Sequence, residues 1–113
     1  MNENSPYLGK WKITEMEQWD QDYIDLVVPG YIEFKTDESG AFQFGTVQGW
    51  IDYRIERFNE VEIIAFSWQG MSDTDPGCGR GWAMIVGNGG ELYGRIHIHC
   101  ADDSDFHANR MYE

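Results

Sequence analysis

The chain has 113 residues, a mass of 13.1 kDa and a formal net charge of −12, with 8 lysines and arginines against 20 aspartates and glutamates. This length fits one domain, expected to span residues 1–113. The negative charge disfavours binding to nucleic-acid phosphates or to anionic lipid, because both need cationic side chains. The 5 Trp, 6 Tyr and 6 Phe indicate a folded chain rather than a disordered acidic tail.

The N-terminus and the cysteines indicate a cytoplasmic protein. Residues 1–6 contain neither a basic cluster nor an apolar stretch, and so do not look like a secretory signal. No apolar run approaches the roughly 18 residues of a membrane-spanning helix. Cys78 and Cys100 do not form a CxxC motif; we expect free thiols in a reducing compartment, with a disulfide as the alternative. No cofactor is predicted.

Short runs of β-branched and aromatic residues, separated by turn residues, predict eight β-strands. The strands are expected at 8–15, 30–36, 40–47, 49–57, 60–69, 80–87, 91–100 and 105–112, with turn signals at 37–40, 48–49, 59–60, 75–77 and 88–90. Between the first two strands, apolar residues recur at helical spacing over Met16–Val27, and Pro29 with Gly30 ends the pattern. One short amphipathic helix is therefore predicted there.

Sequential strands joined by short turns predict a mainly β fold, an eight-stranded antiparallel meander. Such a sheet is expected to close into a barrel, because closure removes exposed strand edges. Alternation then assigns side chains to an inner and an outer face. The inner face is expected to hold Trp11, Ile13, Ile32, Phe34, Phe42, Phe44, Ile51, Tyr53, Ile55, Ile64, Phe66, Trp68, Ile96, Ile98 and Cys100, and the outer face to hold Asp52, Arg54, Glu56, His97 and His99 among others.

The aromatic inner face has two interpretations. The rings either fill the barrel or line a pocket that is open at one end, covered by the helix as a lid, and able to hold a small neutral or cationic molecule. The candidate ligand-binding residues are Trp11, Trp19, Tyr23, Phe34, Phe42, Phe44, Tyr53, Phe66 and Trp68.

Two neighbouring strands are apolar on both faces, between Val61 and Val86. An apolar outer patch has to be covered, either by the helix or a loop of the same chain or by a second copy of the protein. A homodimer formed through the Val61–Val86 hairpin is therefore a hypothesis.

The motifs for metal binding and catalysis are weak. His97 and His99 lie on one strand face at a spacing suited to two metal ligands, but no third ligand is fixed, and surface histidines are the alternative. Residues 73–77 lack the full ligand set of a calcium loop, and the glycines of residues 77–81 favour a bulged hairpin start with close backbone approach rather than phosphate binding. No catalytic residue is assigned; an enzyme of isomerase or cyclase type would be tested first at Glu15, Tyr53 and Arg95.

Gly9-Lys10-Trp11 resembles the Gly-x-Trp that opens lipocalin-like (calycin) barrels. The resemblance implies that the tryptophan closes one end of the barrel and packs against a basic residue from a late strand, here Arg95 or Arg110. The chain is shorter than a typical lipocalin and is closer in size to avidin-like or fatty-acid-binding-type barrels. Residues 66–70, 79–83 and 99–106 look like those of a family of small bacterial proteins of uncharacterised function.

Three functions follow from these patterns. The first is a non-enzymatic barrel that binds a small molecule, the second is a filled barrel that acts as a protein-interaction module or homo-oligomer, and the third is a small barrel enzyme.

Overall fold

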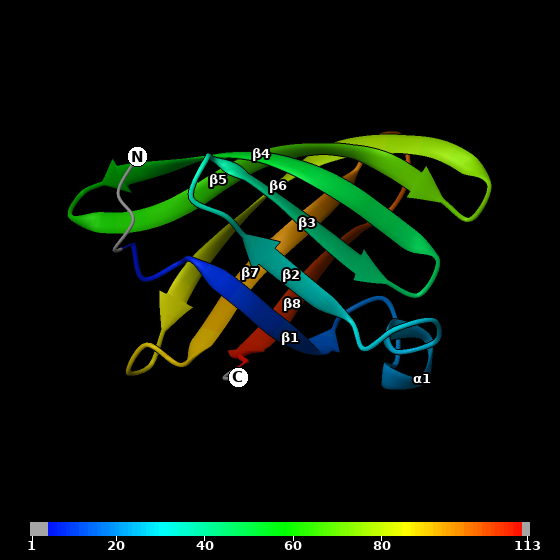
Figure 1. The fold of residues 1–113 in the computed structure, drawn as a ribbon, viewed down its shortest axis with the longest axis horizontal. Helices are drawn as coiled ribbons and strands as arrows, with labels where there is room; N and C mark the ends of the chain where they lie inside the picture. The colour runs from blue at the N-terminus through cyan, green and yellow to red at the C-terminus, as the bar shows by residue number, and fades with distance from the viewer. Residues whose placement is uncertain (1–4, 112–113) are drawn as a thin grey trace.

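The sheet of this protein closes on itself, and the apolar side chains that alternate along its strands face the enclosed interior. The computed structural model describes residues 5–111 as a closed barrel in which each strand pairs antiparallel with the next and β8 pairs with β1 (Figure 1). The elements are β1 (Gly9–Met16), α1 (Gln21–Ile24), β2 (Tyr31–Phe34), β3 (Ser39–Phe44), β4 (Val47–Phe58), β5 (Val61–Ser72), β6 (Asp75–Val86), β7 (Glu91–Ile98) and β8 (Asp103–Arg110). The predicted fold class is confirmed. Tyr112, at the end of the predicted eighth strand, and the N-terminal residues 1–4 lie outside the described residues.

The predicted helix has the right position after the first strand but the wrong bounds. Met16 belongs to β1, where it pairs with Phe106 of β8. The helix α1 begins after Asp20, whose carboxylate accepts a hydrogen bond of 3.0 Å from the Tyr23 amide. Asp25 follows its last residue. The helix is short because β1 pairs with β8 as far as Met16, and that pairing outweighs the local helical periodicity.

Two predicted turns are wrong because their residues pair within strands. The β5–β6 turn lies at Asp73, which has a left-handed φ of 60°, and Pro76 is paired with Met71 of β5. The pairing of β6 with β7 starts only at Gly79, so one side of Pro76 is a free edge, where proline is tolerated. Residues 48–49, also predicted as a turn, lie in β4 opposite β3.

The inner face carries the core. Most side chains assigned to the interior are buried, while Ile55 and Ile98 are half-buried. Cys100 was expected inside and is instead exposed, because it lies in the β7–β8 turn with a left-handed φ of 62°. Cys78 is exposed as well, and both thiols are free, as expected.

One end of the barrel is closed by Trp11 and the segment before β1. The Trp11 indole is fully buried and its Nε1 donates to the Tyr7 carbonyl at 3.1 Å. The Arg110 guanidinium from β8 lies 4.1 Å from the centre of the Trp11 ring and also donates to the carbonyls of Leu8 and Pro6. Of the two basic residues considered for this contact, Arg110 makes it.

The Tyr7 hydroxyl joins two strands where their pairing ends. β5 and β6 pair as far as Ile64 and Ala83, and beyond this point they separate (Figure 1). There the Tyr7 hydroxyl donates to the Glu62 carbonyl at 3.0 Å and accepts from the Ile85 amide at 3.3 Å. Burial raises the pKa of Tyr7. The hydroxyl thus satisfies two backbone groups that the sheet leaves unpaired.

We expect Tyr7→Phe to lower the free energy of unfolding by about 1–3 kcal/mol, because it leaves these two backbone groups without a partner. Urea denaturation followed by far-UV circular dichroism measures the change. Tyr31→Phe is the matched control: no hydrogen bond from the Tyr31 hydroxyl is found among residues 5–111, so this variant should stay within about 0.5 kcal/mol of the wild type. Equal losses in the two variants would contradict the bridging role.

Candidate functional site

The nine side chains predicted to bind a ligand inside the barrel pack mainly against one another. Seven of them are exposed by no more than 4%, and Trp19 and Tyr23 are partly buried. The Phe42 ring lies 5.8 Å from the Phe44 ring and 5.1 Å from the Trp68 ring, between ring centres. The centre of the Phe34 ring lies 5.3 Å from that of Tyr53 and 6.3 Å from that of Phe66. An interior ligand would have to displace some of these rings, so the interior site stays a prediction.

The segment around α1 covers the barrel end opposite Trp11. The Trp19 ring lies 4.8 Å from Phe44, and Ile24 is fully buried. Gly45, in the β3–β4 turn, donates its amide to the Ile24 carbonyl at 3.0 Å. A Cβ on Gly45 would lie 2.2 Å from the Tyr23 ring, so the glycine allows this close approach. The helix occupies the place expected of a lid, and its opening stays a prediction.

Asp25 fastens this segment to β1. Its carboxylate accepts from the Gly30 amide at 2.8 Å, from Lys12 Nζ at 2.9 Å and from Gln21 Nε2 at 3.0 Å. These contacts, the Gly30 hydrogen bond first, lower the pKa of Asp25 from 3.8 to about 2. The charged carboxylate therefore stabilises the packing of the α1 segment against β1.

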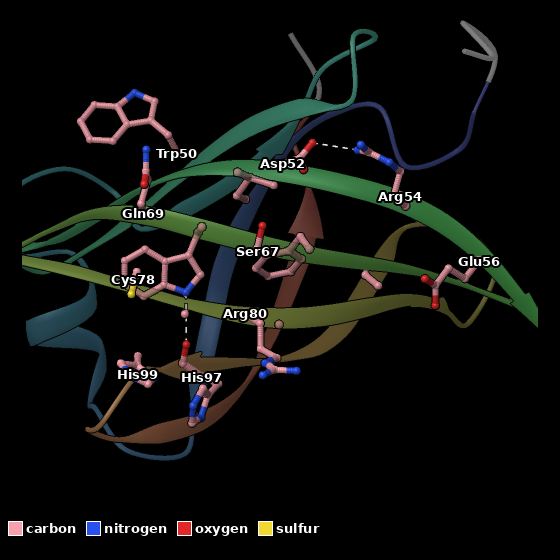
Figure 2. Close-up of a pocket in the computed structure, with 16 residues that line it drawn as sticks. Trp50, Asp52, Arg54, Glu56, Ser67, Gln69, Cys78, Arg80, His97 and His99 are labelled. Carbon is pink, nitrogen blue, oxygen red and sulfur yellow. Dashed lines mark hydrogen bonds and ion pairs between the residues drawn. The ribbon is translucent and has the colours of Figure 1, made fainter.

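A different candidate site lies on the outside of the barrel, across β4, β5, β6 and the end of β7. It is a hollow of about 950 Å³, which we call the outer groove (Figure 2). The outward-facing residues that line it are Trp50, Asp52, Arg54, Glu56, Ala65, Ser67, Gln69, Cys78, Arg80, His97 and His99. The alternation of apolar and polar residues in the sequence predicted that several of these side chains face outward. Trp50 was not included in that prediction, although it lies between the inward-facing Gly49 and Ile51 and must therefore face outward.

Strand register arranges the groove side chains in two rows. Trp50 lies opposite Gln69, and Gln69 lies opposite Cys78. In the next row, Ser67 lies between Asp52 and Arg80, and Arg80 lies opposite His97. Side chains directly opposite on one face of a sheet are within contact range of each other. The outer groove therefore presents a continuous polar strip that runs across the strands, with the Trp50 indole at one edge (Figure 2).

Glycines in β6 hold the floor of the outer groove close to the core. Gly79 and Gly81 face inward, where they pair with Trp68 and Phe66 of β5. A Cβ on Gly81 would lie 2.5 Å from the Phe66 ring, and one on Gly79 would lie 1.8 Å from the His97 carbonyl oxygen. The Trp68 indole donates to that carbonyl at 3.2 Å. The close backbone approach expected of these glycines is confirmed, whereas the expected bulge is not found, because β5 and β6 pair there without a register shift.

The charges that line the outer groove cancel. The carboxylates of Asp52 and Glu56 contribute two negative charges, and the guanidinium groups of Arg54 and Arg80 contribute two positive charges. Arg54 Nη1 donates to Asp52 at 2.7 Å and lies 3.8 Å from a Glu38 oxygen. The hydrogen bond to Asp52 is the main cause that raises the pKa of Arg54. With neutral histidines, the groove is locally uncharged on a protein of net charge −12.

The outer groove continues toward the β5–β6 turn. A second hollow of about 470 Å³ shares Trp50, Gln69 and Cys78 with it and extends over Gly70, Pro76 and Gly77. The Trp50 side chain belongs to both hollows and is 57% exposed. Together the two hollows form an elongated depression.

The other candidate motifs are not brought together. The His97 ring pairs with the Asp103 carboxylate, and no group of three or more His, Cys, Asp or Glu side chains within residues 5–111 is placed to hold a metal ion. Tyr53 lies inside the barrel and donates to the Lys35 carbonyl, whereas Glu15 and Arg95 are on the outer face, where Arg95 lies 3.6 Å from Glu17. The three residues named for an enzyme thus do not form one site.

The patch proposed for a homodimer faces outward. Val61 is 46% exposed, and the neighbouring apolar residues on this face of β5 and β6 are half-buried. The Trp82 ring there packs edge-on against Tyr93 at 5.7 Å. The helix α1 packs against β1 at another part of the barrel. Dimerisation through this surface stays a prediction.

Comparison with protein-family models, curated proteins and solved structures finds no match for this chain. Among the described residues no helix is long and apolar enough to cross a lipid bilayer. The fold defines the class of the protein as a closed eight-stranded antiparallel β-barrel with one short helix after its first strand.

We expect Asp25→Asn to lower the free energy of unfolding at pH 7 by about 1 kcal/mol, because the ionised carboxylate is favoured in the folded state and is partly screened by solvent. Its pKa is depressed on folding, so this contribution is present above about pH 4 and is lost as the pH falls toward 2. Denaturation curves of variant and wild type should therefore converge in acid. Asp22→Asn, on the exposed side of the same helix, is the control, and a loss as large as that of Asp25→Asn would contradict the fastening role.

Proposed function

We propose that this protein is a non-enzymatic binding protein that holds a small, uncharged polar molecule in the outer groove. The observation that carries the proposal is the exposed Trp50 indole beside a continuous strip of hydrogen-bonding side chains. Binding sites combine an apolar surface, which supplies most of the affinity, with a few placed polar groups, which fix the orientation of the ligand. Trp50 supplies the apolar surface, and Gln69, Ser67 and Asp52 supply the polar groups.

The close packing of the groove floor on buried rings supports this location over the interior. Ligand binding in the interior requires α1 to open and Trp19 to leave Phe44. Binding in the outer groove requires neither movement, because the backbone of β6 already rests on Trp68 and Phe66. A preformed site avoids the free-energy cost of ordering flexible groups on binding.

The charge pattern supports an uncharged ligand. Asp52 is already paired with Arg54, so neither group has a full charge left to offer a ligand. Anionic molecules are also repelled by the net charge of −12, although salt screens this repulsion beyond roughly 8 Å. Hydrogen-bond donors and acceptors, rather than ion pairs, are what the groove offers.

The two free thiols give a direct test of the site. Cys78 lies in the outer groove and Cys100 lies in the β7–β8 turn outside it, and both are exposed. Iodoacetamide alkylation of each thiol is followed by mass spectrometry in the presence of nucleosides, polyols, amides and disaccharides. We expect at least one of these uncharged compounds to slow alkylation of Cys78 about fivefold or more and to leave Cys100 unchanged; fivefold protection corresponds to a concentration of about four times Kd.

A groove-blocking variant completes this test. Ser67→Tyr places a large side chain in the middle of the outer groove and should abolish the protection of Cys78 by the bound compound. Asn109→Tyr makes the same kind of change on the exposed face of β8, outside the groove, and should retain the protection. Protection of Cys78 by none of these compounds, or protection that survives Ser67→Tyr in a correctly folded protein, would overturn the proposal.

A further inference from the structure

We infer that the ligand of the outer groove is a neutral oligosaccharide, with one sugar ring stacked on Trp50. This inference rests on the proposed function and names the chemical class of its ligand. Three properties of the site lead to it: the length of the depression, the exposure of the indole, and the absence of net charge.

The depression is longer than one small molecule requires. The outer groove alone has about 950 Å³, near the upper end of the roughly 300–1,000 Å³ typical of small-molecule pockets. The second hollow adds about 470 Å³ and continues past Trp50 toward Pro76. An open, elongated site of this kind suits a chain of several linked units, with Trp50 within the site rather than at its limit.

The Trp50 indole offers the surface that a sugar ring needs. Its ring face carries partial negative charge, and the C–H groups on one face of a pyranose carry partial positive charge. The inward-facing aromatic rings of β4 and β5, such as Tyr53, Phe66 and Trp68, are buried, whereas the Trp50 side chain faces outward within the groove and is 57% exposed. Burying this indole against a sugar face removes apolar surface of both partners from water.

The polar strip matches the hydroxyl groups at the edge of a sugar ring. Gln69, opposite Trp50 on β5, offers both a donor and an acceptor. In the next row, Asp52 is held by Arg54 at 2.7 Å, which fixes the orientation of its carboxylate as an acceptor. Ser67 lies beside it. Vicinal hydroxyls present donors and acceptors in alternation, and these three side chains can pair with both.

The charges decide between a glycan and a nucleic acid, which also stacks its bases on aromatic side chains. A single-stranded nucleic acid brings a phosphate with every unit, and its binding depends on a positively charged groove. Here Asp52 and Glu56 cancel Arg54 and Arg80, and the whole protein is strongly acidic. A chain of uncharged units meets no such repulsion.

Affinity electrophoresis in native gels tests the inference. The gels contain soluble neutral polysaccharides, namely mixed-linkage β-glucan, xyloglucan, galactomannan and pullulan, and polygalacturonate serves as the anionic comparison. We expect at least one neutral polysaccharide to retard the wild-type protein. Trp50→Ala should weaken the retardation about tenfold or more, because the variant loses the stacked contact; tenfold in affinity corresponds to about 1.4 kcal/mol. Trp50→Phe should retain part of it.

Phe58→Ala is the matched control. Phe58 is also on β4 and is 73% exposed, but it lies at the β4–β5 turn, outside the outer groove. Its retardation should equal that of the wild type, and near-UV circular dichroism should show that every variant keeps its fold. Retardation that Trp50→Ala and Phe58→Ala reduce equally would overturn the stacking role of Trp50.

The remaining outcomes separate this inference from the proposed function. If no neutral polysaccharide retards the protein while a small uncharged compound still protects Cys78, the inference of an oligosaccharide ligand is wrong, and the outer groove remains a binding site for a small molecule. If the protein binds single-stranded oligothymidine or polygalacturonate more tightly than any neutral polysaccharide, the charge argument and this inference fail. If Trp50→Ala instead changes the oligomeric state of the protein in light scattering and no polysaccharide binds, the groove is a contact between copies of the chain, and both proposals fail.

Discussion

The pairing of β8 with β1 is the constraint on which the rest of this structure depends. It turns eight short strands into a ring without free edges, so that alternate side chains of every strand face a common axis. The aromatic residues that meet there can contact one another across the barrel, as Phe42 contacts Trp68. Burial of these rings is the main favourable term in stability, and the closed ring of backbone hydrogen bonds is what gives them a shared interior.

The same closure explains why both the interior and its ends are occupied by the chain's own side chains. The Arg110 guanidinium holds Trp11 at one end, and α1, fastened by Asp25, covers Phe44 at the other. The chain thus covers both ends of its own barrel, and the outer groove lies on the outer face of its long strands β4, β5 and β6. There the inward glycines of β6 let Trp68 reach the His97 carbonyl, so that the core supports the surface directly above it.

The sequence was sufficient to predict the strand order, the closed barrel and most inward-facing residues of β1 to β5, because period-two alternation is a local signal. It assigned no inward-facing residue to β6 or β8, where Ala83, Phe106 and Ala108 are buried. The sequence was insufficient wherever strand pairing outweighed the local preference of a residue. Pro76, a turn-forming residue, lies in β6, where no strand pairs with its other side, and Met16, predicted to be helical, pairs with Phe106 of β8. The outer groove was also missed. Each of its side chains looks like an ordinary solvent-facing residue, and only the register of β4, β5 and β6 shows that Trp50, Gln69 and Cys78 share a row.

The division of each strand into two faces has a consequence for how such a protein changes over time. Ser67 faces the groove while its neighbours Phe66 and Trp68 fill the core, and Asp52 stands in the same way between Ile51 and Tyr53. A mutation at an outward position can therefore alter the chemistry of the outer groove and leave the stability of the protein almost untouched. A lineage that keeps the inward residues and the β6 glycines is free to vary its outer surface at alternate positions along β4 and β5.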